Sequence, residues 1–253
     1  MNFRKDTAIV LSSSVIGEAD VLITVLTKDF GKRKFVIKGL KKSTKRSKIA
    51  SQCGVVLSVD YNYYENKDFQ TVKEFSITHS FPNIQNDYKK IIAMCFICEV
   101  CEKTTAYNEF NLKMFELIAA ALKTLENSSH PLSVSCFFII HTLKLHGILT
   151  DLYNCKICGN KVNNKFTFDT KNFNKDFNIV CMECSLNSSH SISYQAIEFI
   201  NDSLTVKYAD IPIERFSDKT LSNLLFYLCL FTEHYFGILL NSKKLLLSEE
   251  YNV

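Results

Sequence analysis

The sequence predicts an α+β protein in which a small N-terminal β-barrel precedes an α-helical domain that carries an inserted four-cysteine ribbon. Residues 7–78 are rich in β-branched and aromatic residues between turn residues, and the apolar spacing becomes helical from about residue 87. Two Cys-x-x-Cys pairs interrupt the helical part within 151–190. We therefore expect two domains, 1–80 and 81–253, with the insertion in the second.

Composition is that of an ordinary folded protein. The chain has 253 residues, of which 47% are hydrophobic and 22% charged, values typical of globular proteins with a sizeable core. No apolar run approaches the roughly 18–20 residues that span a bilayer. The apolar run 8–11 is also too short for the central region of a signal peptide. We expect a cytoplasmic protein without a membrane segment.

Short strands account for the first part of the chain. Five segments have strand patterns: 7–17, 20–27, 32–39, 54–64 and 69–78. The connection between the second and third contains Gly31, which can adopt the positive φ that a hairpin requires. Five short strands in about 70 residues indicate a small antiparallel barrel, for which the OB-fold is a natural candidate. Periodicity leaves the order of the strands open.

Helices follow from about Asp87. Apolar residues have helical spacing over 91–100, 112–125 and 218–235. A further helix is expected to begin at Pro131, because proline suits the first helical position, and to end at Gly147. Its expected apolar face consists of Phe137, Phe138, Ile140, Leu143 and Leu145.

The insertion has the spacing of a metal site. Its cysteines are Cys155 and Cys158, then, after 22 residues, Cys181 and Cys184. Four thiolates can surround one Zn²⁺ tetrahedrally, and Gly159 allows a tight turn after the first pair. A redox dithiol and four ordinary buried cysteines are the alternatives; the paired spacing favours zinc. Because four cysteines leave no open coordination position, we expect one structural Zn²⁺.

Three other cysteines have a spacing that an iron–sulfur cluster would use. Cys95, Cys98 and Cys101 are three residues apart, but they lie inside an uninterrupted helical pattern without a glycine or proline to fold a loop around a cluster. We interpret them as core residues, a common role for free cysteine.

Motifs for catalysis are missing from the sequence. It contains no G-x-x-x-x-G-K-[ST], no G-x-G-x-x-G and no G-x-S-x-G. His141 and His146 are five residues apart and fall on different faces of a helix. The sequence therefore gives no support for an enzyme.

Positive charge is concentrated between Lys28 and Lys48. This stretch has ten basic residues and one acid, a net charge of +9, whereas the rest of the chain has 20 basic and 25 acidic residues, a net charge of −5. Such a local field attracts a polyanion whatever the total charge is. The candidate DNA-binding residues are Lys32, Arg33, Lys34, Lys38, Lys41, Lys42, Lys45, Arg46 and Lys48.

Two interpretations of this stretch stay open. After an expected strand over 32–38, the polar residues up to Lys48 indicate a loop, and a solvated lysine-rich loop is the simpler interpretation. Alternatively, the loop binds single strands, which requires a positive groove for phosphates and aromatic faces for bases. The barrel offers Phe30, Phe35, Tyr61, Tyr63, Tyr64 and Phe69 as aromatic faces, several of which we expect in the core.

Residues 17–48 contain a recognisable series of residues: Gly17, Glu18, Asp20, Thr27, Gly31, Lys38, Gly39, Lys41, Lys42 and Ser43. By this series, the segment resembles the opening of the bacterial RecO recombination-mediator family. The segment LYNCKICG at 152–159 resembles the start of the zinc module found in many members, and the order of barrel, helices, insertion and helices also matches. This chain departs from the family at 41–42, where members often have arginine, and at 178–180, where they usually have small residues.

The resemblance implies a non-enzymatic DNA repair and recombination mediator. Such proteins bind single- and double-stranded DNA, anneal complementary strands coated with single-stranded DNA-binding protein (SSB), and act with RecR to help load RecA. It further implies RecR contact near the barrel, the SSB C-terminal tail in a groove of the helical domain, and a cytoplasmic, nucleoid-associated location. The alternatives are a zinc-ribbon transcription or translation factor and a metal-dependent nuclease, which would need a carboxylate or histidine cluster that we do not find.

Overall fold

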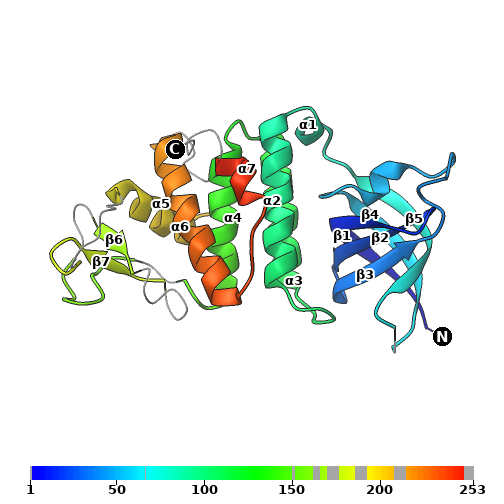
Figure 1. The fold of residues 1–253 in the computed structure, drawn as a ribbon, viewed down its shortest axis with the longest axis horizontal. Coiled ribbons are helices and arrows are strands. Elements are labelled where there is room, and N and C mark those ends of the chain that lie inside the picture. Colours follow the sequence, from blue (N-terminus) through cyan, green and yellow to red (C-terminus); the bar gives the residue numbers. More distant parts are fainter. Residues whose placement is uncertain are drawn as a thin grey trace. The chain divides into compact units, whose positions relative to one another are not determined.

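The chain folds into two compact units, Met1–Asn127 and Ser128–Val253. The computed structural model describes residues 2–65, 67–149, 152–161, 166–169, 177–185, 193–207 and 215–247. The first unit holds a barrel and three α-helices, and the second holds four helices and a small hairpin among its described residues (Figure 1). The expected domain boundary at residues 80 and 81 stays a prediction.

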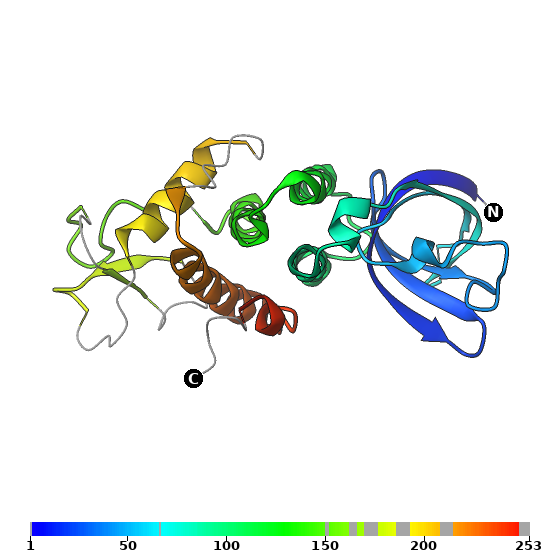
Figure 2. The ribbon, with the colours of Figure 1, turned by 90° about the horizontal axis from the view of Figure 1, so that it is seen from above.

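A closed five-stranded barrel forms the N-terminal part of the first unit. Its strands are β1 (Asn2–Ile16), β2 (Asp20–Thr27), β3 (Gly31–Ile37), β4 (Val56–Tyr63) and β5 (Gln70–His79). They follow the order β1-β2-β3-β5-β4, and β4 pairs back to β1. All neighbours are antiparallel except β3 and β5, and the strands curve around a common axis (Figure 2). The predicted OB-like barrel is therefore confirmed, and the structure supplies the strand order.

The first strand is longer than predicted because it takes part in both halves of the barrel. Its first part pairs with β4 and its second part with β2, and a register shift between Val10 and Ser12 marks the change. Such an irregularity lets a strand bend from one sheet half into the other. Alternate side chains point into the barrel, where the rings of Phe35 and Tyr61 lie 4.7 Å apart.

Three helices follow the barrel in the first unit. They are α1 (Pro82–Gln85), α2 (Tyr88–Thr104) and α3 (Leu112–Asn127); a short 3₁₀ helix, η1 (Lys48–Ser51), precedes β4. Asp87 caps α2, since its carboxylate accepts hydrogen bonds from the amides of Lys89 and Lys90. On α2, the buried Cys98 thiol donates to the carbonyl of Val10 on β1 over 3.8 Å. Helix α2 thereby packs on the barrel wall.

The second unit is built around α4 (Pro131–Leu145). This helix contacts α5 (Tyr194–Thr205) and α6 (Asp218–Phe236), and α7 (Lys243–Leu247) follows. The hairpin of the insertion consists of β6 (Phe166–Phe168) and β7 (Ile179–Cys181). Gly237 ends α6 with a φ of +63°, a conformation that glycine adopts readily.

The helical part differs in some details from the sequence-based expectation. Leu145 was expected on the apolar face of α4 but is 40% exposed, because α4 is buried on nearly all sides from Ser133 to Leu143 and its last turn reaches solvent. Helix α5 was not predicted, although Ala196 and Ile200 have helical spacing and are buried. Across the described part of the chain, none of the helices combines the length and apolarity that crossing a membrane requires.

Candidate nucleic-acid interface and metal centre

The basic loop, residues 38–48, leads from β3 into η1. Its fold is fixed by Leu40, which is buried, and by the amide of Gly39, which donates to the Asp20 carboxylate over 2.8 Å. The amide of Arg46 donates to the Ser43 hydroxyl over 2.9 Å. These contacts use backbone amides, the Ser43 hydroxyl and Leu40 on the side of the loop, and none of them uses a cationic side chain. The exposed cations of the loop are Lys38, Lys41, Lys42, Lys45, Arg46 and Lys48.

One ion pair links the loop to the β1–β2 turn. Lys42 lies 2.8 Å from the Glu18 carboxylate, and both side chains are exposed. Exposed pairs of this kind contribute about 0–1 kcal/mol, so a stronger anionic ligand would compete with Glu18 easily.

A shallow groove of about 380 Å³ separates the basic loop from β5. Its lining residues are Lys45, Arg46, Ser47, Lys73, Glu74, Phe75, Ser76 and Ile77. Three cations face one acid there. Lys73 was not predicted, because it is 25 residues from the charge run in sequence and comes beside it only when β5 joins the barrel.

Lys32 is the candidate DNA-binding residue whose placement differs most from the rest. Only 5% of it is exposed, and its ammonium donates to the backbone carbonyl of Glu102 over 2.5 Å. Burial lowers the pKa of Lys32. Its Nζ also lies 4.1 Å from the centroid of the Tyr107 ring. Lys32 therefore holds the end of α2 and the chain that follows it against the barrel, and it has little surface to offer a phosphate.

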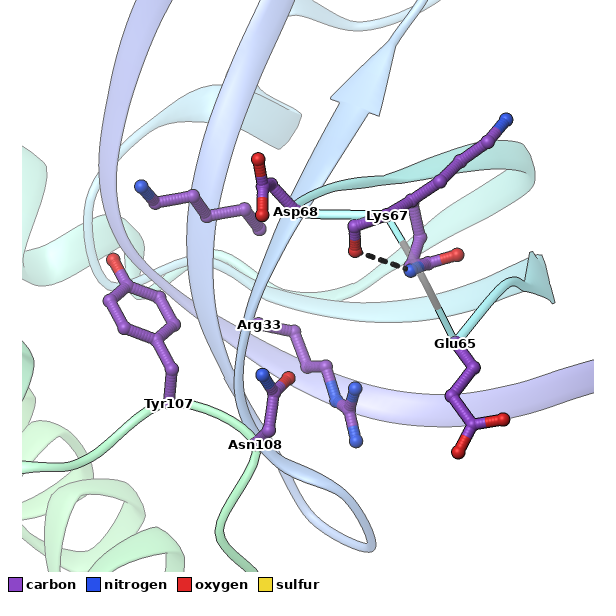
Figure 3. A pocket seen from close by; sticks show the side chains of 8 residues that line it. Arg33, Glu65, Lys67, Asp68, Tyr107 and Asn108 are labelled. Atoms are coloured by element: carbon purple, nitrogen blue, oxygen red, sulfur yellow. Dashed lines mark hydrogen bonds between the residues drawn. The ribbon is translucent and has the colours of Figure 1, made fainter.

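Arg33 and Lys34, the other two candidates on β3, line a second groove of about 540 Å³ (Figure 3). The remaining lining residues are Glu65, Lys67, Asp68, Gln70, Tyr107 and Asn108. Gln70 shapes one wall, because its amide donates to the carbonyls of Tyr64 and Lys67 and accepts from the amide of Tyr64. Three cations and two acids make this lining mixed in charge. We call it the β3 groove.

The six candidate aromatic residues differ in how far they are exposed to solvent. Phe35 and Tyr61 are buried in the barrel core, whereas Phe69 is exposed. Phe30 and Tyr63 are half-buried and enclose the guanidinium of Arg4, whose carbon lies 4.1 Å and 3.8 Å from the two ring centroids. In the same way, Lys67 lies 4.4 Å from the ring of Tyr64. Arg4 was not predicted, because β1 and β4 must pair before it meets Tyr63.

The four cysteines of the insertion come together as one group. Cys155, Cys158, Cys181 and Cys184 have their sulfur atoms within 4.8 Å of one another. The first pair lies on a turn whose Gly159 has a φ of +72°, and the second pair begins at the end of β7. These four thiols could hold one metal ion.

Hydrogen bonds favour a thiolate at the centre of this group. Cys155 is buried, which raises its pKa, but its sulfur accepts from the amides of Ile157 and Cys181 over 3.4 Å and 3.3 Å, and the pKa falls to about 6. The pKa of Cys184 instead rises to about 12 through its hydrogen bonds with Cys181 and Cys158. Thiols this close cannot all be negative unless a cation sits among them.

The other cysteine run lies on α2. Cys98 and Cys101 are buried and Cys95 is half-buried, at three successive turns of an unbroken helix. Burial raises the pKa of Cys101 to about 12. These thiols pack as small apolar side chains, as interpreted from the sequence.

Comparisons with known proteins agree across both parts of the chain. Residues 1–81 match the family model for the N-terminal part of recombination protein O, and residues 85–244 match the model for its C-terminal part. The DNA repair protein RecO of Caldanaerobacter subterraneus subsp. tengcongensis is 26% identical over 222 residues, which cover 86% of this chain and 85% of the relative. The RecO proteins of Leptospira biflexa and Bifidobacterium animalis subsp. lactis are 24% and 30% identical, covering 73% and 64% of this chain and 73% and 68% of the relatives. This chain therefore belongs to the RecO family of DNA repair proteins.

Proposed function

We propose that this chain is a non-enzymatic mediator of DNA repair and recombination. It binds single- and double-stranded DNA, anneals complementary strands coated with SSB, and with RecR promotes the loading of RecA. The observation that supports this most directly is the basic loop, which presents six exposed cations beside a barrel of the OB type in a member of the RecO family.

The mechanism that the surface supports is electrostatic. Two complementary strands repel each other, and cations that neutralise their phosphates reduce this repulsion. The basic loop supplies such cations on flexible lysine side chains, and Lys73 on β5 continues the positive surface along the adjoining groove. Lysines contact the backbone without reading its sequence, so the expected binding is insensitive to sequence and weakens as the salt concentration rises.

The proposed division of labour follows the two domains expected from the sequence. Residues 1–80 bind DNA and contact RecR, and residues 81–253 receive the acidic SSB tail, while RecA is reached indirectly through RecR. We place the protein in the cytoplasm, at the nucleoid.

The cysteine group fits a structural Zn²⁺. An all-sulfur set of four donors suits zinc and leaves no position for a substrate, and the amide hydrogen bonds to Cys155 are of the kind that stabilise a ligating thiolate. When bound, the ion would tie the turn at Cys155–Cys158 to the end of β7. It would therefore stabilise the insertion without taking part in a reaction.

The test is the annealing of two complementary oligonucleotides, each coated beforehand with the cognate SSB. The proposal predicts that the protein accelerates annealing of the coated strands. If it anneals naked strands but not coated ones, the DNA contact stands and the mediator function is refuted. If the protein binds neither naked nor SSB-coated strands, DNA binding itself is refuted.

Reversal of charge on the basic loop provides the matched variant. Lys41, Lys42, Lys45 and Arg46 are changed to Glu, and a control variant changes Lys113, Lys123, Lys207 and Lys219 to Glu, which alters the net charge equally at exposed sites elsewhere. We expect the first variant to lose most DNA affinity with nearly unchanged melting temperature. On single strands, the slope of log affinity against log salt should fall by about 0.7 for each phosphate that the variant no longer neutralises. Equal losses in both variants would show that overall charge, and not the loop, governs binding.

A further inference from the structure

The connection between α2 and α3, residues 105–111, is attached to the start of β3. The amide of Asn108 donates to the carbonyl of Lys32 over 3.0 Å, and Tyr107 forms a parallel bridge with the same residue. A Cβ at Gly31 would lie 1.8 Å from the carbonyl oxygen of Glu109. Backbone therefore packs directly on backbone, and this connection is a fixed addition to the barrel.

This attachment brings an aromatic ring from outside the barrel into the β3 groove. Tyr107 lines the groove, and 43% of the residue is exposed. The buried ammonium of Lys32 lies 4.1 Å from the ring centroid and the ammonium of Lys34 lies 5.1 Å from it. These contacts hold the ring in place, since cation–π interactions of this geometry are attractive.

The charges around the ring limit what the groove can accept. In Figure 3, Tyr107 lies on one side of the groove and Glu65 on the other, with Arg33 between them. Glu65 and Asp68 would repel a continuous row of phosphates along the groove. Arg33, Lys34 and Lys67 can still neutralise the phosphate of a single nucleotide. A lone base with its own phosphate is the ligand that this mixture of charges suits.

We propose that Tyr107 is a stacking platform for one unpaired base of single-stranded DNA bound in the β3 groove. The inference rests on the proposed DNA-binding function and adds to it a contact that distinguishes single strands from duplex. Aromatic side chains stack on the faces of bases, and in a duplex these faces are covered by the neighbouring base pairs. Tyr107 should therefore contribute to binding of single strands and not of duplexes.

The sequence offers a sharp reporter for this contact, because the chain has no tryptophan. In the variant Tyr107→Trp, the tryptophan fluorescence comes from a single indole ring at the proposed platform. We expect an oligothymidylate to quench this fluorescence, and an abasic oligonucleotide with the same number of phosphates to bind without quenching it. Tyr88→Trp is the control: Tyr88 is 68% exposed at the first turn of α2, roughly 25 Å from the other end of this helix by its rise per residue.

Affinity measurements complete the test. Tyr107→Leu should weaken binding of the oligothymidylate by roughly five- to a hundredfold and leave the affinities for the abasic strand and for duplex unchanged. Tyr107→Phe should retain the affinity of the original protein, because the ring face is kept. If Tyr107→Leu binds all three DNAs as the original does and the fluorescence of Tyr107→Trp is not quenched, the platform is refuted while DNA binding stands. If the original protein binds no DNA at low salt, the proposed function falls and the platform with it.

Discussion

Substitution of Gly31 by alanine tests the attachment of residues 105–111 to the barrel. Gly31 has a φ of +72°, and its missing Cβ would be 1.8 Å from the carbonyl oxygen and 2.5 Å from the carbonyl carbon of Glu109. Ordinary contacts of a Cβ begin at 3.4 Å, so one of the two backbones must move by about 1.6 Å. Because no side chain can rotate away, the connection must detach or shift.

The cost of this substitution has two parts. The left-handed conformation costs an alanine about 1–2 kcal/mol relative to glycine. Detaching the connection removes the hydrogen bond from Asn108 to Lys32, about 1 kcal/mol, and the cation–π interaction of Lys32 with Tyr107, on the order of 0.5–2 kcal/mol. The total is about 2–5 kcal/mol, and it cannot exceed this by much, because a detached connection relieves the clash.

Gly17→Ala is the matched control, since Gly17 also has a positive φ, +59°, but nothing lies within 4 Å of its missing Cβ. It should therefore cost only the conformational part. Urea unfolding of the full chain measures both free energies, and hydrogen exchange of the Asn108 amide measures the attachment itself. Equal destabilisation by the two substitutions, with unchanged exchange at Asn108, would refute the attachment described here.

Two further predictions concern the second unit. Cys155→Ser should reduce bound zinc below one ion per chain and lower the melting temperature, and it should affect DNA affinity only secondarily. The control variant Cys95→Ser should keep its zinc. Metal analysis and calorimetry of both variants test this prediction. His141 is stacked on Phe137 at 4.2 Å and its Nε2 lies 2.7 Å from the carbonyl of Ser203. Burial lowers the pKa of His141 in the folded protein below 6.5, the pKa of histidine in the unfolded chain. The stability that neutral His141 contributes is therefore complete above pH 6.5, and it is lost as the pH falls from 6.5 through the lower pKa of the folded protein. Between these two pKa values, the free energy of unfolding of the unsubstituted protein should fall more steeply than that of His141→Gln, by up to about 1.4 kcal/mol per pH unit. Parallel pH profiles of the two free energies would contradict a buried, neutral His141.

The barrel strands and the helices α2, α3, α4 and α6 could be predicted because their patterns are local. The alternation within β2 and the glycine at the start of β3 are sufficient to locate both strands, and the four cysteines could be grouped because their spacing is characteristic of zinc sites. The exposed end of α4 could not be predicted, because this helix is apolar on nearly all sides and its sequence does not distinguish which end reaches solvent.

The candidate site was only partly predictable because its residues come from distant segments. A search for runs of charge finds the basic loop but cannot find Arg4, Lys67 or Lys73, which are separated from it in sequence. It also cannot distinguish Lys32 from Lys34. Both belong to the same face of β3 by the period of two, yet Lys32 is buried beneath a segment about 70 residues later, whereas Lys34 is only half-buried. Whether a cation is available to DNA is thus decided by tertiary packing.

Annealing sets a requirement that distinguishes the two kinds of contact proposed here. A protein that brings complementary strands together must hold each strand without occupying the base edges that will pair. Lysines of the basic loop would contact phosphates, and Tyr107 would contact the face of a base, so both leave the pairing edges free. When the second strand pairs, stacking between neighbouring base pairs would replace stacking on Tyr107, and the base would leave the β3 groove. The platform would therefore bind the single strands, the reactants of annealing, more tightly than the duplex product. The basic loop also binds duplex phosphates, so it would not by itself favour release of the duplex.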